Sequence, residues 1–338
     1  MKFQLRTVEE IKKDIATARD IADQIKELSR KPGYGGDVRE AATRVYRNPP
    51  TEGFRVVALW LSFGGETIFL QDADSLVMKT PNLLDVLWFL KETFPDVTRV
   101  TSYGRSNTAA RKSLDELREI REAGLTRLHM GLESGCDEVL KYVRKGTTAE
   151  EHIKGGKKVV ESGISLCQYV MPGLGGKRWS RDHALETARV LSEVNPAFIR
   201  LRSLSVREDI PLFQKWASGE FELLSDDEVV QEIKEMIESL EVTSYLASDH
   251  IENLLQEIEG QLPQDKGRML AVIERYQRLS PEDRLNFQFG QRAGHYSELA
   301  DLNISRLRQR IDSTIADITN KGGDINQVVL NLKKRFLV

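Results

Sequence analysis

The stretch RLHMGLES, residues 127–134, distinguishes between the two sheet architectures that this sequence allows. Its apolar residues alternate with a histidine, a glycine and Glu133, so the two sets fall on opposite faces of a strand. In a barrel, the outer face of each strand packs against helices. The pattern therefore predicts a barrel strand whose apolar face points outward and whose Glu133 points to the interior.

The stretch FIRLRSL, residues 198–204, repeats this alternation. Its apolar residues would face outward, while Arg200 and Arg202 would face inward. Two arginines inside a closed, dry barrel would carry a large desolvation cost. We therefore expect an open, wet barrel mouth in which Arg200 and Arg202 bind an anionic substrate. The alternative is a structural ion network of these arginines with Asp72 or Glu133.

Predicted strands alternate with single amphipathic helices along the first two thirds of the chain. This order is typical of βα units and a parallel sheet. The predicted strands cover residues 67–71, 98–103, 127–132, 165–170 and 198–204, and the helices between them cover 82–93, 113–123, 149–161 and 181–193. A barrel or partial barrel is the leading architecture, and a doubly wound open sheet is the second. The stretch 54–65, FRVVALWLSFGG, fits a strand or a helix, and we expect a helix.

The pattern changes at Ser225. From there on the apolar spacing predicts amphipathic helices without strands between them, including ASDHIENLLQEIEGQL at residues 247–262. We expect a partial barrel over residues 1–222 and a helical C-terminal region over residues 223–338.

The composition predicts a cytoplasmic protein. Of 338 residues, 40% are hydrophobic and 30% are charged, and the formal net charge of −3 provides no basic field for nucleic acid. The N-terminal residues are charged and lack the apolar core of a secretory signal. The apolar stretch at 54–65 is far shorter than the ~20 residues of a membrane helix, so we expect no membrane association.

The chain has two cysteines, Cys136 and Cys167. They are too few for a disulfide framework and too far apart for a CxxC metal site. We expect both to be buried or half-buried free thiols.

Polar residues follow successive predicted strands, where βα barrels carry their active sites. In TIFLQDADSLVM, residues 67–78, Asp72 and Asp74 follow the first predicted strand, and Ser102 and Glu133 end the next two. Each acid has a structural alternative: the aspartates as turn residues or helix caps, and Glu133 as a solvated loop acid. The occurrence of these polar residues at the ends of successive strands favours a binding site.

Several longer blocks carry a family resemblance. They are IFLQDADSLVMKTPNLLDVLWFLKETFP, RVTSYGRSNT, LDELREIREAGLTRLHMGLESG, VLKYVRKGTTAEEHIKGGKKVVESGI and YVMPGLGG. In this order they resemble the radical SAM enzymes, in the branch of the Elongator catalytic subunit and oxygen-independent coproporphyrinogen oxidase. The resemblance covers residues 1 to about 205. It implies a partial (β/α)6 barrel that binds S-adenosylmethionine.

The resemblance also implies which strand-end residues contact this cofactor. Asp72 and Asp74 stand where the family holds the amino group of S-adenosylmethionine after its second strand, and carboxylates are suitable acceptors for an ammonium. Glu133 matches a polar residue that contacts the ribose or the amine in relatives. We include Ser102, at the end of the next strand after the aspartates, in this set.

Two further positions complete the implied cofactor site. Arg144 matches a basic position that meets the cofactor carboxylate in relatives, and Lys145 is its rival. Gln168, on the fifth strand of the family order, is the candidate for a ribose contact.

The sequence departs from the family at the cluster loop. Family members bind a [4Fe–4S] cluster through three cysteines in a C-x3-C-x2-C loop after the first strand. This sequence has no such loop and no third cysteine, and KFQLRTVEEI at residues 2–11 resembles the segment that follows the loop. The first strand would then be missing too, and we assign no catalytic residue and no metal ligand.

We therefore expect a truncated form of a radical SAM enzyme, inactive as it stands. The intact form would cleave S-adenosylmethionine at a [4Fe–4S] cluster, with electrons from a reductant such as flavodoxin or ferredoxin, and start radical chemistry on an unknown substrate. The alternative is a cluster-less barrel remnant that acts as a binding or scaffold protein. An unrelated aldolase-like barrel is disfavoured because no lysine or metal triad lies at a strand end.

Overall fold

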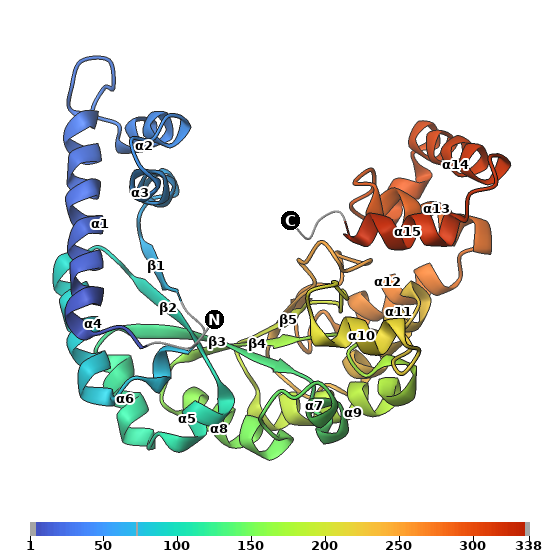
Figure 1. Ribbon diagram of the computed structural model, residues 1–338, viewed down its shortest axis with the longest axis horizontal. Coiled ribbons are helices and arrows are strands. Elements are labelled where there is room, and N and C mark those ends of the chain that lie inside the picture. The colour runs from blue at the N-terminus through green and yellow to red at the C-terminus, as the bar shows by residue number, and fades with distance from the viewer. Residues whose placement is uncertain (1–4, 72–73, 335–338) are drawn as a thin grey trace. The chain divides into compact units, whose positions relative to one another are not determined.

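The computed structural model describes residues 5–71 and 74–334, and Figure 1 shows the elements. The strands are β1 (Thr67–Leu70), β2 (Arg99–Gly104), β3 (Leu125–Glu133), β4 (Ser165–Val170), β5 (Phe198–Leu201), β6 (Tyr245–Ala247) and β7 (Gly260–Gln261). The first helices are α1 (Val8–Ser29), α2 (Val38–Arg47), α3 (Glu52–Ser62), α4 (Thr80–Thr93), α5 (Ser106–Arg111), α6 (Leu114–Glu122), α7 (Asp137–Tyr142) and α8 (Ala149–Glu161). They are followed by α9 (Gly176–Val194), α10 (Pro211–Ala217), α11 (Asp226–Ser239), α12 (Lys266–Gln277), α13 (Pro281–Arg292), α14 (Ser305–Asn320) and α15 (Ile325–Lys334). Short 3-10 helices are η1 (Ser75–Val77) and η2 (Leu299–Asn303).

The strands form a mostly parallel sheet. Their order in the sheet is the order in the chain, from β1 to β7. β1 pairs with β2, β4 with β5 and β5 with β6 in parallel, whereas β7 pairs antiparallel with β6. The α/β class predicted from the alternating strands and helices is therefore confirmed, and the sheet agrees with a partial barrel.

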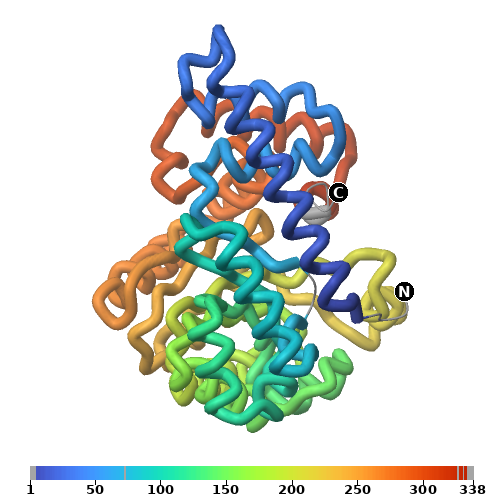
Figure 2. The backbone as a smooth tube through the Cα atoms, turned by 90° about the vertical axis from the view of Figure 1, so that its left-hand side faces the viewer, coloured from blue at the N-terminus to red at the C-terminus, as the bar shows by residue number. Residues whose placement is uncertain are grey.

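The first compact unit comprises residues up to 129 together with residues 158–165. Its long helix α1, dark blue in Figure 2, packs against α2, α3 and α4. A capping box begins α1: Thr7 Oγ1 accepts from the Glu10 backbone N–H at 3.2 Å, and Glu10 Oε2 accepts from the Thr7 backbone N–H at 2.8 Å. Helix α3 confirms the prediction for the stretch 54–65.

The second compact unit comprises residues 130–157 and 166–338. Helix α11 packs against α9 and α12, and α13, α14 and α15 pack against one another (Figure 1). The region after residue 222 is largely helical, as predicted. It also contributes β6 and β7 to the sheet, which the sequence pattern did not indicate. The division at residue 222 itself stays a prediction.

The predicted alternation of faces is confirmed along β3 and β5. The apolar residues of one face, Leu128, Met130, Leu132, Ile199 and Leu201, are each 0% exposed. Glu133, Arg200 and Arg202 on the other face are half-buried. Burial of one face of each strand therefore determines which side chains the strands direct away from the helices.

The predicted helix at residues 247–262 is wrong. This segment contains the end of β6, an irregular loop and β7. Asn253 explains the loop: its amide Nδ2 donates to the Leu201 carbonyl and to Ser248 Oγ, both at 3.0 Å, and its Oδ1 accepts from the Ser203 backbone N–H at 3.0 Å. These bonds satisfy backbone groups at the end of β5, which a helix in this position could not do.

Within residues 5–71 and 74–334, no helix combines the length and the apolar character that a membrane crossing requires.

Two helical glycines give a matched test of the packing. A Cβ at Gly156 in α8 would lie 2.7 and 2.9 Å from the two methyl carbons of Val194, whereas a Cβ at Gly267 in α12 would meet nothing within 4 Å. Because Val194 is β-branched and stiff, we expect Gly156→Ala to lower the free energy of unfolding by about 1–2 kcal/mol. Gly267→Ala should raise it by up to ~1 kcal/mol through helix propensity. Urea denaturation measures both, and equal stabilities of the two variants would contradict the packing of α8 against Val194.

Candidate functional site

Glu133 ends β3 and forms an ion pair with Lys145. The distance from Lys145 Nζ to Glu133 Oε1 is 2.9 Å, and the two side chains are 24% and 21% exposed. Glu133 has a left-handed backbone, with φ of 62°, and so does Arg144, with φ of 55°. Such conformations cost about 1–3 kcal/mol in a non-glycine residue and persist where the surroundings fix them, often at functional sites.

Gly131 provides the space for this ion pair. A Cβ at this position would lie 2.2 Å from Glu133 Oε1 and 2.9 Å from Lys145 Nζ. Any side chain at residue 131 would therefore displace the carboxylate and the ammonium. Of the two basic candidates from the sequence, Lys145 pairs with Glu133, while Arg144 occupies the turn before it.

Buried hydrogen bonds from α9 hold the loop that follows Glu133. Ser134 Oγ lies 2.8 Å from His183 Nδ1 and accepts from the Cys136 backbone N–H at 3.0 Å. The Gly135 backbone N–H donates to Thr187 Oγ1 at 2.8 Å. The loop after β3 is therefore attached to two side chains of one helix.

The same histidine reaches the loop after β4. His183 Nε2 lies 3.1 Å from the Met171 carbonyl oxygen, so we assign the proton to Nε2 and the Ser134 hydroxyl as donor to Nδ1. Glu232 of α11 lies 3.7 Å from His183 Nε2 and accepts from the Gly173 backbone N–H at 2.6 Å and from Ser180 Oγ at 2.5 Å. One network thus joins two strand ends to α9 and α11.

Burial shifts the titration of both groups in this network. It lowers the pKa of His183 to about 4 and raises the pKa of Glu232 to about 7. Both side chains are therefore held in their uncharged forms at mildly acidic pH. Nothing in the sequence pattern singled out His183 or Glu232, because each lies within an ordinary amphipathic helix.

Arg200 and Arg202 share one carboxylate. Arg202 Nη1 lies 2.9 Å from Asp249 Oδ1, and Arg200 also forms an ion pair with Asp249. Although burial acts to raise it, the two arginines hold the pKa of Asp249 below its usual value. Both guanidinium groups lie over the Tyr169 ring, 5.9 and 5.3 Å from its centroid. Two cations against one carboxylate leave one positive charge for an anionic ligand.

The ion partner of these arginines is thus Asp249, which the sequence prediction placed in a helix. Among the described residues, the arginines pair with this carboxylate after β6 and Glu133 pairs with Lys145, while Asp72 lies outside the described residues. Asp249 follows β6, and the parallel pairing of β6 with β5 brings it next to the two arginines.

Gln168 lies on the other face of β4 from these arginines. In the register of β4 and β5, Gln168 pairs with the buried Ile199, whereas Tyr169 pairs with Arg200. Gln168 is 0% exposed, and its amide atoms have no hydrogen-bond partner among the described residues. This placement puts Tyr169, and not Gln168, on the face of the arginines, and the expected ribose contact of Gln168 stays a prediction. The sequence SLCQYV contains this information, because Leu166 and Val170 share the parity of Gln168.

Asp74 and Ser102 belong to the first unit and form hydrogen bonds with other residues of that unit. Asp74 Oδ1 accepts from the Arg105 backbone N–H at 3.2 Å and Oδ2 from Thr108 Oγ1 at 2.6 Å, at the start of α5. Burial raises the pKa of Asp74 despite these bonds. Ser102 is 0% exposed, with its Oγ 2.5 Å from Ser75 Oγ. Asp72 lies outside the described residues. The structural alternative therefore accounts for the bonds of Asp74.

The available donors do not fit a [4Fe–4S] cluster. Cys136 and Cys167 are both buried thiols outside any disulfide, as predicted, and burial raises the pKa of the Cys136 thiol. Within the described part of the chain, no group of three or more histidine, cysteine, aspartate and glutamate side chains could hold a metal ion. A cluster needs thiolate ligands, which these two thiols cannot supply in the required number.

Replacement of Glu232 tests the buried network. The carboxyl loses its proton near pH 7 in the folded chain, against a usual pKa of 4.5. Between these values the folded state binds more protons than the unfolded state, so the stability contributed by this group falls as the pH rises from 4.5 to 7. Gln in this position cannot ionise and can keep both hydrogen bonds. We expect Glu232→Gln to match the unsubstituted chain near pH 4.5 and to exceed its unfolding free energy by up to ~3 kcal/mol at pH 8.

Urea titrations at several pH values measure this difference. His183 acts in the opposite sense between pH 4 and 6.5, but it is present in both proteins, so the difference isolates Glu232. Glu238→Gln, an exposed position on the same helix, is the control and should change stability by less than ~1 kcal/mol at any pH. A pH-independent difference for Glu232→Gln would contradict a buried, late-ionising carboxyl.

Comparisons with known proteins show what part of this chain is similar to. Residues 41–188 match the family model of the radical SAM superfamily. A tRNA uridine(34) acetyltransferase from Methanocaldococcus infernus is 25% identical over 119 residues, which are 35% of this chain and 22% of that protein. The match thus spans about a fifth of the length of this curated relative.

Solved structures give weaker similarities. The archaeal Methanocaldococcus infernus Elp3 with an N-terminal deletion has a TM-score of 0.46 and 17% identity, covering 62% of this chain and 55% of that one. Coproporphyrinogen III oxidase (HemN) from Escherichia coli, a radical SAM enzyme, has a TM-score of 0.43 and 16% identity, covering 70% of this chain and 47% of that one. The family model supports the resemblance found in the sequence: residues 41–188 of this chain match the model of the radical SAM superfamily.

Proposed function

We propose that this chain is the S-adenosylmethionine-binding part of a radical SAM enzyme, in which Glu133 and Lys145 hold the amino-acid end of the cofactor. The ion pair at the end of β3 is the observation that carries the proposal. It is half-buried, it spans Gly131, and the backbone that presents Glu133 is left-handed.

The chemistry of the pair matches the amino-acid end of S-adenosylmethionine. That end carries an ammonium and a carboxylate side by side. Glu133 accepts hydrogen bonds from the ammonium, and Lys145 donates to the carboxylate, so one internal ion pair is exchanged for two pairs with the ligand. Arg144, adjacent to Lys145, is the second candidate for the carboxylate.

The proposal assigns binding to this chain and assigns no radical step to it. The [4Fe–4S] cluster supplies the electron for cleavage of S-adenosylmethionine in this superfamily, and the two buried cysteines do not fit it. Cleavage, electron supply by flavodoxin or ferredoxin, and hydrogen abstraction from a substrate near Arg200 and Arg202 are therefore proposed for a protein form that has the cluster cysteines. A cytoplasmic location is part of the same proposal.

A cluster-less binding protein is the second candidate, and the burial of both thiols favours it. Anaerobic reconstitution with iron and sulfide addresses this point. We expect far less than one cluster per chain, and stoichiometric formation of 5′-deoxyadenosine after reduction would contradict the proposal that this chain does not cleave the cofactor.

Isothermal titration with S-adenosylmethionine tests the binding site. We expect Glu133→Gln to weaken binding at least about tenfold, which is ~1.4 kcal/mol, because the amide removes the charge that pairs with the ammonium. Lys145→Met should weaken binding to a similar degree by removing the partner of the carboxylate.

Glu150→Gln, an exposed glutamate of α8 in the same unit, serves as the matched control and should leave the affinity unchanged. Equal affinities of Glu133→Gln and Glu150→Gln would remove Glu133 from the site. The absence of binding at millimolar S-adenosylmethionine by the unsubstituted chain would overturn the proposal as a whole.

A further inference from the structure

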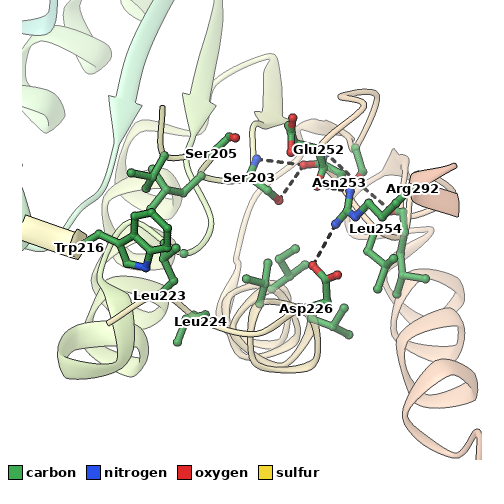
Figure 3. A pocket seen from close by; sticks show the side chains of 18 residues that line it. Ser203, Ser205, Trp216, Leu223, Leu224, Asp226, Glu252, Asn253, Leu254 and Arg292 are labelled. Atoms are coloured by element: carbon green, nitrogen blue, oxygen red, sulfur yellow. Dashed lines mark hydrogen bonds and ion pairs between the residues drawn. The ribbon is translucent and has the colours of Figure 1, made fainter. Parts of the chain in front are cut away.

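A pocket lies within the second unit, at the carboxyl ends of β5 and β6 (Figure 3). Its volume is about 80 Å³, more than the ~10–15 Å³ that one water occupies. The pocket is lined by residues 203–206, directly after β5, and by residues 252–255, after β6. Side chains of α10, α11 and α13 complete its walls. In open parallel sheets, crevices outside the carboxyl ends of the strands are the usual ligand sites.

The entrance of this pocket is apolar. Leu204, Trp216, Leu223, Leu224 and Val229 line it, and each of these side chains remains half-buried. Figure 3 shows Trp216, Leu223 and Leu224 together on one side of the pocket. Large apolar side chains that line a hollow and stay partly exposed favour an apolar ligand group in contact with them.

The floor of the pocket is polar and buried. Arg292 Nη2 donates to Asp226 Oδ1 at 3.0 Å, with both side chains at most 7% exposed. Arg292 Nη1 donates to the Glu252 carbonyl oxygen at 2.9 Å. Arg292 Nε is buried and has no hydrogen-bond partner among the described residues. One strong donor therefore remains for an acceptor atom at the floor.

The charges at the floor select against ionised ligands. Asp226 already neutralises Arg292, and the buried Glu252 lines the same floor. A ligand carboxylate would meet these two carboxyl groups in a low-dielectric site, and a ligand ammonium would lose its hydration there without offering an acceptor to Arg292 Nε. An uncharged oxygen acceptor avoids both costs.

We propose that this pocket binds a small uncharged amphipathic molecule. One hydroxyl or carbonyl oxygen of this molecule accepts from Arg292 at the floor, and its apolar or aromatic body contacts Trp216, Leu223 and Leu224. The site shares no residue with the Glu133–Lys145 pair or with the Arg200, Arg202 and Asp249 cluster. The inference therefore stands independently of the proposed S-adenosylmethionine site.

Phenol is a suitable probe, with benzoate and benzylammonium as its anionic and cationic counterparts. Titration of the full chain is followed by the chemical shift of the Trp216 indole N–H, assigned with Trp216→Phe. We expect phenol to bind saturably at millimolar concentration, and each charged probe to bind about tenfold more weakly or not at all because of the unpaired burial of its charge.

Two valine-to-phenylalanine variants localise the binding. Val229→Phe adds volume at the pocket wall and should weaken phenol binding at least about tenfold. Val56→Phe makes the same change at a 60% exposed position on α3 and should leave it unchanged. If Val229→Phe does not fold, Trp216→Leu serves instead, with an expected loss of several-fold and phenol binding followed by ligand-observed saturation transfer.

Three outcomes would overturn the proposal. They are unsaturable shifts with phenol, charged probes that bind as tightly as phenol, and equal phenol affinities in Val229→Phe and Val56→Phe. Tighter binding of benzoate than phenol would specifically indicate an anion site at Arg292 in place of the uncharged site proposed.

Discussion

The hydrogen bonds of the buried His183 ring are the constraint on which the candidate site depends. One ring nitrogen contacts Ser134 after β3, and the other contacts the Met171 carbonyl after β4. Glu232 extends the network to Gly173 and α11. Because His183 and Glu232 are buried, the network excludes water and fixes two loops at once. The left-handed backbone of Glu133 adjoins this anchored segment, which accounts for its persistence.

The charged side chains at the ends of β3 and β5 have defined partners. Glu133 contacts Lys145, and Arg200 and Arg202 contact Asp249. These pairs are half-buried, so their charges are partly desolvated and interact more strongly than charges at the surface. A ligand that binds to both Glu133 and Lys145 has to replace their ion pair, and a zwitterion can do so without leaving an unpaired charge.

The sequence allowed much of the fold to be predicted and less of the site. The alternation in residues 127–134 and 198–202 correctly gave the faces of β3 and β5, because strand periodicity is local. The cysteines were correctly expected to be buried free thiols. Tyr169, which shares the face of Arg200, was not singled out, although the alternation of SLCQYV places it on the other face from Gln168. Asp249 was missed because the apolar spacing of residues 247–262 is also compatible with a helix.

The sequence by itself determined the succession of strands and helices up to the end of β5, the caps and the charge of each strand face, since these depend on neighbouring residues. Only the tertiary structure decided that residues 247–262 form a strand and a loop, because Asn253 binds groups of residues 201, 203 and 248. It also decided that His183 joins two strand ends and that Lys145 pairs with Glu133. Apart from Asn253 and Ser248, these partners lie at least 12 residues apart in the chain, and their contacts exist only after the sheet and its covering helices have assembled.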